Sequence, residues 1–267
     1  MKIKLICSDI DGTLLNKERE LSKRTIVAIK NIHHIPFILI SSRMPQAMFH
    51  LQQELDSVHL PMIAYNGGLI LDNNKVLHST EIDAVSIKSI VEFCKSTTIH
   101  ISLYHKDEWY VPALDYWAKR EQNNTKVTPQ VNPLKETIAK WQKEEKGAHK
   151  IMCMGDVKEI DSLVLFLEKE FPEIVGYRSK PTYLEISHAS ISKKTAIEFL
   201  LKAKYPNLSV EDVLAFGDNY NDVEMLKSVG LGVAVQNARE EVLAVANQIT
   251  AGNKEDGVAI FLENYFD

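Results

Sequence analysis

Short apolar runs that end abruptly in small or polar residues recur along this chain of 267 residues. The runs lie at 3–7, 37–40, 61–65, 213–216 and 231–235. Strands that are apolar at consecutive positions are typical of parallel sheets, in which both faces are buried. Helical patterns separate the runs, for example at 22–31 and 45–55. This alternation predicts an α/β fold in which helices cover both faces of a parallel sheet.

A different pattern occupies residues 84–183. Helical patterns at 85–95, 114–120, 134–143 and 156–170 alternate with short strand patterns at 99–104, 109–111, 149–154 and 182–186, and a polar loop is expected at 122–128. This length lies within the usual range for a domain. We therefore expect a Rossmann-like core over 1–83 and 184–267, with a smaller α/β domain inserted over 84–183.

Bulk composition excludes several classes of protein. The net charge of −5 argues against a broad nucleic-acid-binding surface. No apolar run approaches the roughly 18 residues that a membrane helix needs, and we expect no signal peptide, because no apolar segment with a cleavage site comes before Asp9. Three widely spaced cysteines indicate buried thiols in a reducing compartment. We expect a cytoplasmic protein without nucleic-acid or membrane partners, and the sequence does not determine its oligomeric state.

The first apolar run ends in two aspartates, Asp9 and Asp11, followed by Gly12. Aspartate is depleted in strands, and side chains at i and i+2 of a strand point the same way. Two carboxylates about 4 Å apart repel by roughly 4 kcal/mol at an effective dielectric constant near 20. A divalent cation or a shared proton could offset this repulsion. The structural alternative is an ordinary polar turn at the end of a strand.

Other predicted strands also end in polar residues. Ser41-Ser42-Arg43 and Asn66-Gly67-Gly68 follow two of them, and Asp218 and Asp222 follow a third. Ligands of open α/β sheets bind outside the carboxyl ends of the strands. Four carboxylates at one edge, without cysteine or histidine, favour Mg²⁺. Lys193 opens a predicted helix and could bring a positive charge to a phosphoryl group.

The motif Asp-Ile-Asp-Gly-Thr at 9–13, then Ser41, Lys193 and the Gly217–Asp222 segment, resembles the four-motif set of haloacid dehalogenase-like (HAD) phosphatases. The long insertion between the second and third motifs resembles the Cof-type subgroup. So do Asn-Gly-Gly at 66–68 and Glu-Asp-Gly-Val at 255–258. The resemblance covers the predicted core. It implies a Mg²⁺-dependent phosphatase that acts on a small phosphorylated metabolite such as a sugar phosphate, with the insertion as a cap that determines substrate specificity.

The resemblance also implies catalytic roles. Asp9 would be the nucleophile that forms an aspartyl-phosphate. Asp11 would exchange protons with the leaving group and with water, which requires a raised pKa that its charged neighbour and partial burial favour. Asp9, the backbone carbonyl of Asp11, and Asp218 would hold Mg²⁺. Asp222 would support either the metal site or Lys193.

Substrate-binding positions follow from the same resemblance. The candidates are Gly12, Ser41, Ser42, Arg43, Asn66, Lys193 and Asn221. Two departures from the family pattern leave alternatives open. Ser41-Ser42-Arg43 replaces the usual Thr-Gly-Arg; because a serine hydroxyl can replace that of threonine, Ser41 is the first candidate for binding phosphate and Ser42 the second. Lys194 replaces the usual glycine after Lys193; we expect Lys193 to face the site, with Lys194 as the alternative. Arg43 could instead form a structural ion pair.

Two other functions remain open at this point. On the same fold, a phosphotransferase such as a phosphomutase would pass the phosphoryl group to a sugar instead of water. A degenerate fold could also act as a metabolite-binding module without catalysis.

Overall fold

The computed structural model describes residues 2–266, which form two compact units. The core unit comprises the chain up to Arg43, Met48–His78, and the chain from Ser192 onward. The insert unit comprises Met44–Ala47 and Ser79–Ile191. The predicted boundaries at 83/84 and 183/184 both lie within the sequence of the insert unit. No helix of the described residues combines the length and apolar character that crossing a membrane requires.

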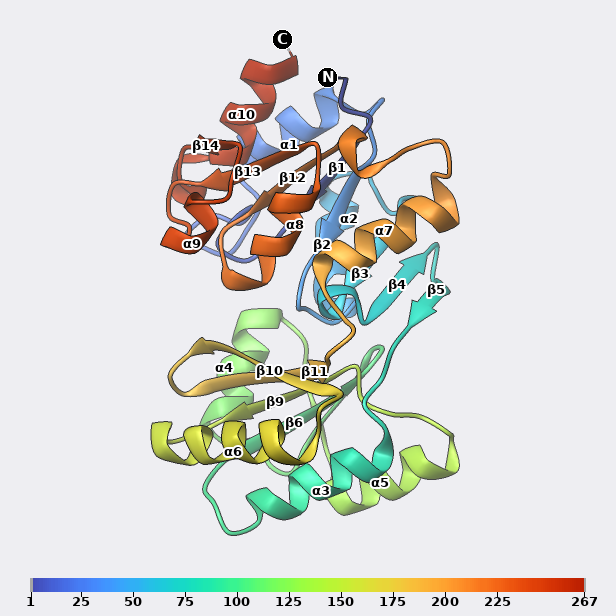
Figure 1. Ribbon diagram of the computed structural model, residues 1–267, viewed down its shortest axis with the longest axis vertical. Coiled ribbons are helices and arrows are strands. Elements are labelled where there is room, and N and C mark those ends of the chain that lie inside the picture. The colour runs from blue at the N-terminus through green and yellow to red at the C-terminus, as the bar shows by residue number, and fades with distance from the viewer. Residues whose placement is uncertain (1, 267) are drawn as a thin grey trace. The chain divides into compact units, whose positions relative to one another are not determined.

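The core unit is built on an eight-stranded sheet in the order β14-β13-β12-β1-β2-β3-β4-β5 (Figure 1). In chain order its strands are β1 (Leu5–Ser8), β2 (Phe37–Ile40), β3 (Met62–Ala64), β4 (Leu69–Asp72), β5 (Lys75–Ser79), β12 (Val213–Gly217), β13 (Leu231–Val235) and β14 (Gln248–Thr250). The strands from β14 to β3 are parallel, and β4 is antiparallel to β3. In the register, Ser8 lies opposite both Phe216 and Leu39. The residues that follow β1, β12 and β2 therefore meet at one edge of the sheet.

Helices cover both faces of this sheet. They are α1 (Lys23–Asn31), α2 (Gln46–Glu54), α7 (Lys193–Lys204), α8 (Val223–Ser228), α9 (Glu240–Leu243) and α10 (Gly257–Phe266). Ala215 of β12 belongs to an apolar cluster with residues of α7, α8 and α9. Its neighbour Phe216 points the other way and meets the Phe261 ring of α10, with centroids 5.4 Å apart. This arrangement confirms the predicted parallel α/β core.

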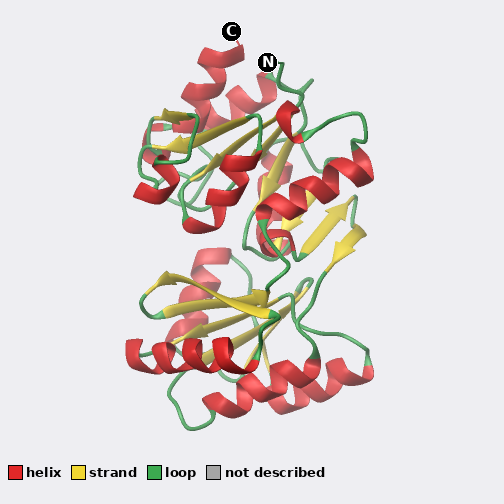
Figure 2. Cartoon of the chain, in the orientation of Figure 1, coloured by secondary structure: helices red, strands yellow, loops and turns green. Residues whose placement is uncertain are grey.

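The insert unit has its own six-stranded sheet, in the order β10-β11-β9-β6-β7-β8 (Figure 2). Its strands are β6 (His100–His105), β7 (Glu108–Val111), β8 (Gln130–Val131), β9 (Lys150–Met154), β10 (Ile174–Lys180) and β11 (Tyr183–His188). Its helices are α3 (Ala84–Cys94), α4 (Tyr116–Thr125), α5 (Leu134–Lys143) and α6 (Val157–Glu170). Residues of α3, α5 and α6 share an apolar cluster with the sheet. Trp109 and Trp141 are buried, as expected for core residues.

Helix α4 differs from its sequence prediction. We expected a helix over 114–120 and a polar loop from 122, but the helix continues to Thr125. The Asp115 side chain caps its start by accepting a hydrogen bond from the Ala118 amide. The helix ends at Lys126, which adopts a left-handed conformation with φ of +61°. The short strand β8 was also not predicted.

Candidate active site

The ends of β1, β2 and β12 bring the predicted site residues together. The Asp9 amide donates to the carbonyl of Phe216 at 3.0 Å, and the Ser41 amide donates to the carbonyl of Ile63 at 3.0 Å. These bonds continue the sheet pairing by one residue beyond each strand. Asp9, Ser41 and the segment after Gly217 therefore lie at the same edge, where a parallel α/β sheet binds ligands.

Lys193 lies buried between two carboxylates. Its ammonium Nζ donates to Oδ1 of Asp9 at 2.5 Å and to Oδ1 of Asp222 at 2.6 Å. Ser192 caps the start of α7 and accepts from the Thr195 amide at 3.1 Å, which fixes the helix end that carries the lysine. The next residue, Lys194, is exposed and lies 3.8 Å from Glu198. Of the two candidate lysines, the structure thus places Lys193 in the site.

Asp222 is fully buried and uses both oxygens within the protein. Oδ1 accepts from Lys193, while Oδ2 accepts from the amides of Asp218 and Asn219 at 2.9 and 3.0 Å. This carboxylate therefore orients the lysine and the loop that carries Asp218. Of the two predicted roles for Asp222, the geometry favours support of Lys193.

Negative charge exceeds positive charge in this cluster. Ligand atoms of Asp9, Asp218 and Asp222 lie within 4.8 Å of one another, beside a single lysine. Burial raises the pKa of Asp218 to about 6, and the charge of Asp222 adds to this effect. Burial also raises the pKa of Asp9 against the opposing effect of Lys193. An all-oxygen donor set with excess negative charge fits a hard divalent cation such as Mg²⁺.

Gly12 allows Asp218 to approach the first motif closely. Gly12 has a φ of +89°, and a Cβ atom at this position would lie 2.4 Å from Oδ2 of Asp218. A side chain here would therefore displace the carboxylate. Thr13, the next residue, donates to Oδ1 of Asp218 at 2.8 Å. Both residues thus fix the position of Asp218.

Asp11 binds two arginines. Arg43 donates to both of its oxygens, from Nε to Oδ2 at 2.6 Å and from Nη2 to Oδ1 at 2.7 Å. Arg19 adds a bond from Nη2 to Oδ1 at 2.8 Å. Burial opposes the shift, but the two guanidinium groups outweigh it and lower the pKa of Asp11. The expectation of a raised pKa was therefore wrong, because the guanidinium groups of Arg43 and Arg19 outweigh the effect of burial.

The other candidates form two pairs. The Ser41 hydroxyl is buried and accepts from the Arg43 amide at 3.2 Å, whereas Ser42 is half-buried. Asn221 donates from Nδ2 to Oδ1 of Asn66 at 3.0 Å. Ser41 thus adjoins Arg43, which binds Asp11, and Asn66 and Asn221 adjoin each other.

Sequence reasoning missed Arg19 and Thr13 as site residues. Thr13 was visible as the last residue of the Asp-Ile-Asp-Gly-Thr motif, so the motif itself could have identified it. Arg19 lies in the charged sequence Lys-Glu-Arg-Glu at 17–20, which is typical of a solvated loop. Its contact with Asp11 depends on the conformation of that loop, for which the sequence carries no specific signal.

A second group of possible metal ligands lies in the insert unit. Ligand atoms of Glu81, His105 and His149 lie within 4.8 Å of one another. The Lys106 amide donates to Nδ1 of His149 at 3.2 Å, so the proton of this ring is on Nε2. That Nε2 lies 3.0 Å from the Ser79 hydroxyl and 3.7 Å from Oε1 of Glu81.

His105 is held in the same way. Its Nδ1 lies 3.0 Å from the carbonyl of Gly147, which can only accept, and 3.5 Å from Oε2 of Glu81. In both histidines, the nitrogen that faces Glu81 therefore carries hydrogen and has no lone pair for a cation. Glu81 accepts further bonds from the Ser79 hydroxyl at 2.8 Å and from the Gly147 amide at 2.7 Å. The insert cluster is thus a hydrogen-bonded network that does not fit a metal.

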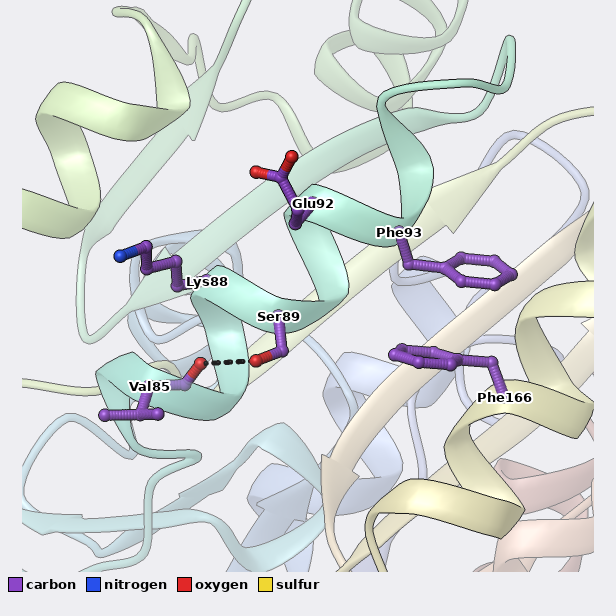
Figure 3. A pocket seen from close by; sticks show the side chains of 6 residues that line it. All are labelled: Val85, Lys88, Ser89, Glu92, Phe93 and Phe166. Atoms are coloured by element: carbon purple, nitrogen blue, oxygen red, sulfur yellow. Dashed lines mark hydrogen bonds between the residues drawn. The ribbon is translucent and has the colours of Figure 1, made fainter.

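An apolar groove lies between α3 and α6 of the insert unit (Figure 3). The rings of Phe93 and Phe166 stack in it with centroids 4.3 Å apart, and Ser89 donates to the carbonyl of Val85. Lys88 and Glu92 complete its lining. This groove lacks the converging carboxylates and buried lysine of the core site, so the chemistry belongs to the core.

Comparison with known proteins agrees with this geometry. The family model of haloacid dehalogenase-like hydrolases matches residues 6–262. A Haemophilus influenzae protein with a provisional phosphatase name is 33% identical over 271 residues, covering 100% of this chain and 99% of the relative. A 5-amino-6-(5-phospho-D-ribitylamino)uracil phosphatase of Bacillus subtilis is 27% identical, covering 98% and 97%. The crystal structure of a haloacid dehalogenase-like hydrolase from Bacteroides thetaiotaomicron has a TM-score of 0.89 at 28% identity, covering 98% of this chain and 99% of that chain.

Proposed function

The chain belongs to the haloacid dehalogenase-like hydrolase family and is a phosphatase, and from this premise we propose a Mg²⁺-dependent reaction through an aspartyl-phosphate on Asp9. The substrate is a small phosphorylated metabolite such as a sugar phosphate. The observation that carries the proposal is the buried Lys193 ammonium, 2.5 Å from the Asp9 carboxylate. Phosphoryl transfer depends on such fixed positive charge beside the reacting groups.

In the first step, a carboxylate oxygen of Asp9 attacks phosphorus and the bond from phosphorus to the leaving oxygen breaks. An ionised carboxylate needs no base to act as a nucleophile. Asp11 donates to the leaving oxygen the proton that it took from water in the previous cycle, and this step requires its bonds with Arg43 and Arg19 to loosen, because those bonds lower its pKa. Lys193, Ser41 and Asn221 bind the phosphoryl oxygens.

In the second step, water attacks phosphorus and Asp11 takes a proton from it. The bond from phosphorus to Asp9 breaks, inorganic phosphate leaves, and Asp11 is protonated for the next cycle. The contacts of Arg43 and Arg19 with Asp11 support this step, because they stabilise the ionised form that acts as the base. Gly12, Ser42, Arg43 and Asn66 are the remaining candidates for substrate contact.

Asp9, Asp218 and the backbone carbonyl of Asp11 would hold Mg²⁺, with Asp222 behind them. When bound, the cation supplies positive charge against the charge that develops on the phosphoryl oxygens. The excess of carboxylates over lysine supports this assignment.

The inserted domain, predicted over 84–183, sets substrate choice in this proposal. Its separate sheet and apolar cluster support an independent structural unit. Cys7, Cys94 and Cys153 are free and buried, which supports a reducing, cytoplasmic setting.

A phosphate-release assay tests the proposal. The panel contains p-nitrophenyl phosphate, several sugar phosphates and 5-amino-6-(5-phospho-D-ribitylamino)uracil, each with Mg²⁺ or with EDTA. We expect release only with Mg²⁺, and a fall in kcat of about a thousandfold or more for Asp9→Asn. If Asp9→Asn hydrolysed p-nitrophenyl phosphate at the wild-type rate, Asp9 would not be the nucleophile. Transfer of phosphate to an added sugar instead of water would indicate a phosphotransferase.

A further inference from the structure

Asp11 binds a second guanidinium group, although the first already donates to both of its carboxylate oxygens. Arg43 binds both oxygens of the carboxylate and is 6% exposed. Arg19 binds Oδ1 as well, and its side chain is 45% exposed. Asp11 and the two arginines together have a formal charge of +1. Arg19 is thus the more accessible of the two arginines beside the proposed proton donor.

Hydrogen bonds within the loop fix the backbone around Arg19. Oδ1 of Asn16 accepts from the amides of Glu18 and Glu20, both at 3.0 Å. The Arg19 amide donates to the carbonyl of Asn16 at 3.0 Å, and Arg19 adopts a left-handed conformation with φ of +63°. Such a conformation costs about 1 kcal/mol or more in a residue other than glycine, and it persists only where surrounding contacts impose it.

The segment between this loop and the first motif is also anchored. Asn237 donates from Nδ2 to the carbonyl of Gly12 at 2.8 Å, and Asn253 donates from Nδ2 to the carbonyl of Leu15 at 2.6 Å. Asn237 and Asn253 are themselves joined by a bond of 2.8 Å. Arg19 is therefore presented from a fixed position relative to Asp11.

We propose that Arg19 binds an anionic group on the leaving group and thereby selects phosphate esters that carry a carboxylate or a second phosphate near the ester bond. The inference rests on the proposed function, because Asp11 faces the leaving group only if it is the proton donor. A guanidinium presents several N–H donors in a planar fork, which suits both carboxylate and phosphate. The other charges of this loop are Lys17 and Glu18, which lie 3.5 Å apart, and Glu20.

The test compares ligands that differ in one anionic group. Binding of 3-phosphoglycerate and of glycerol 3-phosphate is measured by calorimetry with Mg²⁺, in Asp9→Asn protein so that turnover does not interfere. A second pair is fructose 1,6-bisphosphate and fructose 6-phosphate. In at least one pair we expect about tenfold tighter binding of the more anionic ligand, and loss of that preference on adding Arg19→Gln.

Lys17→Gln is the matched control, because it removes one positive charge from the same loop at a residue whose side chain is 72% exposed. It should leave the preference unchanged. The inference is overturned if neither pair shows a preference, if neither ligand of either pair binds, or if Arg19→Gln weakens both members of a pair equally. The last result would make Arg19 a positioning residue for Asp11. Absence of Mg²⁺-dependent phosphate release from the panel would instead refute the proposed function.

Discussion

The core and the insert each bring the ligand atoms of three potential metal ligands within 4.8 Å of one another. The two clusters differ in whether those ligand atoms carry hydrogen. In the core, Asp9 and Asp218 lie in a group of three carboxylates with one lysine, so negative charge remains uncompensated. In the insert, the histidine nitrogens that face Glu81 carry hydrogen, so the carboxylate is already satisfied. The distance between ligand atoms therefore does not identify a metal site unless the hydrogen bonds are also counted.

The clusters also differ in the direction of their pKa shifts. Burial among like charges raises the pKa of Asp218 to about 6. In the insert, burial opposes the shift of Glu81, but bonds from His105, Gly147 and Ser79 lower its pKa to about 2. Burial lowers the pKa of His149 to about 3. The core cluster thus has negative charge that Lys193 alone does not balance, whereas the insert cluster holds a neutral His149 beside an ionised Glu81.

The largest expected effect comes from removing the metal or a carboxylate that would hold it. Chelation with EDTA, or Asp218→Asn, should lower kcat/KM by about a thousandfold or more, because charge stabilisation is the main contribution to phosphoryl transfer. Mg²⁺ should raise the melting temperature of the wild-type protein and not that of Asp218→Asn. An Asp218→Asn enzyme with undiminished Mg²⁺-dependent activity would show that the core cluster, like the insert cluster, is not a metal site.

Removing the buried lysine should have the next largest effect, a loss of stability. Lys193→Met leaves Asp9 and Asp222 without their cation, which should lower the free energy of unfolding by about 3–5 kcal/mol at pH 7.5 without metal. The loss should be smaller at pH 5, because protonation of Asp218 and Asp9 relieves the repulsion. Urea unfolding at both pH values measures this, and the exposed Lys194→Met is the control. An equal loss at both pH values would mean that carboxylate repulsion does not destabilise the variant.

The core site could be predicted because its residues follow parallel strands. The register of β1 with β12 and β2 is sufficient to place Asp9, Asp218 and Ser41 at one edge. The family resemblance already favoured Lys193 over Lys194, but the orientation of the two side chains needed the structure, because it depends on which side of α7 faces the sheet. The fold class followed from the same strand pattern.

Contacts that depend on loops and on antiparallel pairing could not be predicted. Arg19, itself a left-handed loop residue, binds Asp11 and adds to the larger effect of Arg43, so that the pKa of Asp11 is lowered where we expected it to be raised. Glu81 meets the Gly147 amide next to the isolated bridge between Ile82 and Ala148. Neither contact has a local sequence pattern, because the first depends on the conformation of the loop that carries Arg19 and the second joins segments that only the tertiary fold brings together.

Acid should destabilise the insert by a smaller amount. Unfolded histidine has a pKa near 6.5, whereas His149 in the fold has one of about 3, so below pH 6.5 the unfolded state takes up the proton. The insert should therefore lose about 2–3 kcal/mol of stability as the pH falls from 6.5 to 4.5. The contribution of Glu81 is present above about pH 4.5 and is lost as the pH falls from there towards 2.

Tryptophan fluorescence isolates this effect, because the protein's three tryptophans all lie in the sequence of the insert unit. Urea unfolding followed at pH 7, 5.5 and 4.5 should show the loss, and His149→Gln should reduce the pH dependence over this range. His188→Gln, in the same unit, is the control. Unchanged pH dependence in His149→Gln would assign the acid sensitivity to other groups.

The smallest effect is expected when Zn²⁺ is offered to the insert cluster. In Asp218→Asn protein, which disables the core site, added Zn²⁺ should change the unfolding free energy seen by tryptophan fluorescence by less than about 0.5 kcal/mol. Nε2 of His105 is buried without a hydrogen-bond partner among the described residues, but Glu81 lies beside the opposite nitrogen of that ring. To bind a metal through Nε2, His149 would have to move its ring proton from Nε2 to Nδ1. The hydrogen bond from the Lys106 amide to Nδ1 would then be lost. If Zn²⁺ stabilised the insert by more than this, and His149→Gln abolished that stabilisation, the metal would be displacing the hydrogen bonds of the cluster. The insert cluster would then be a metal site, and the two clusters would differ only in their affinity for metal.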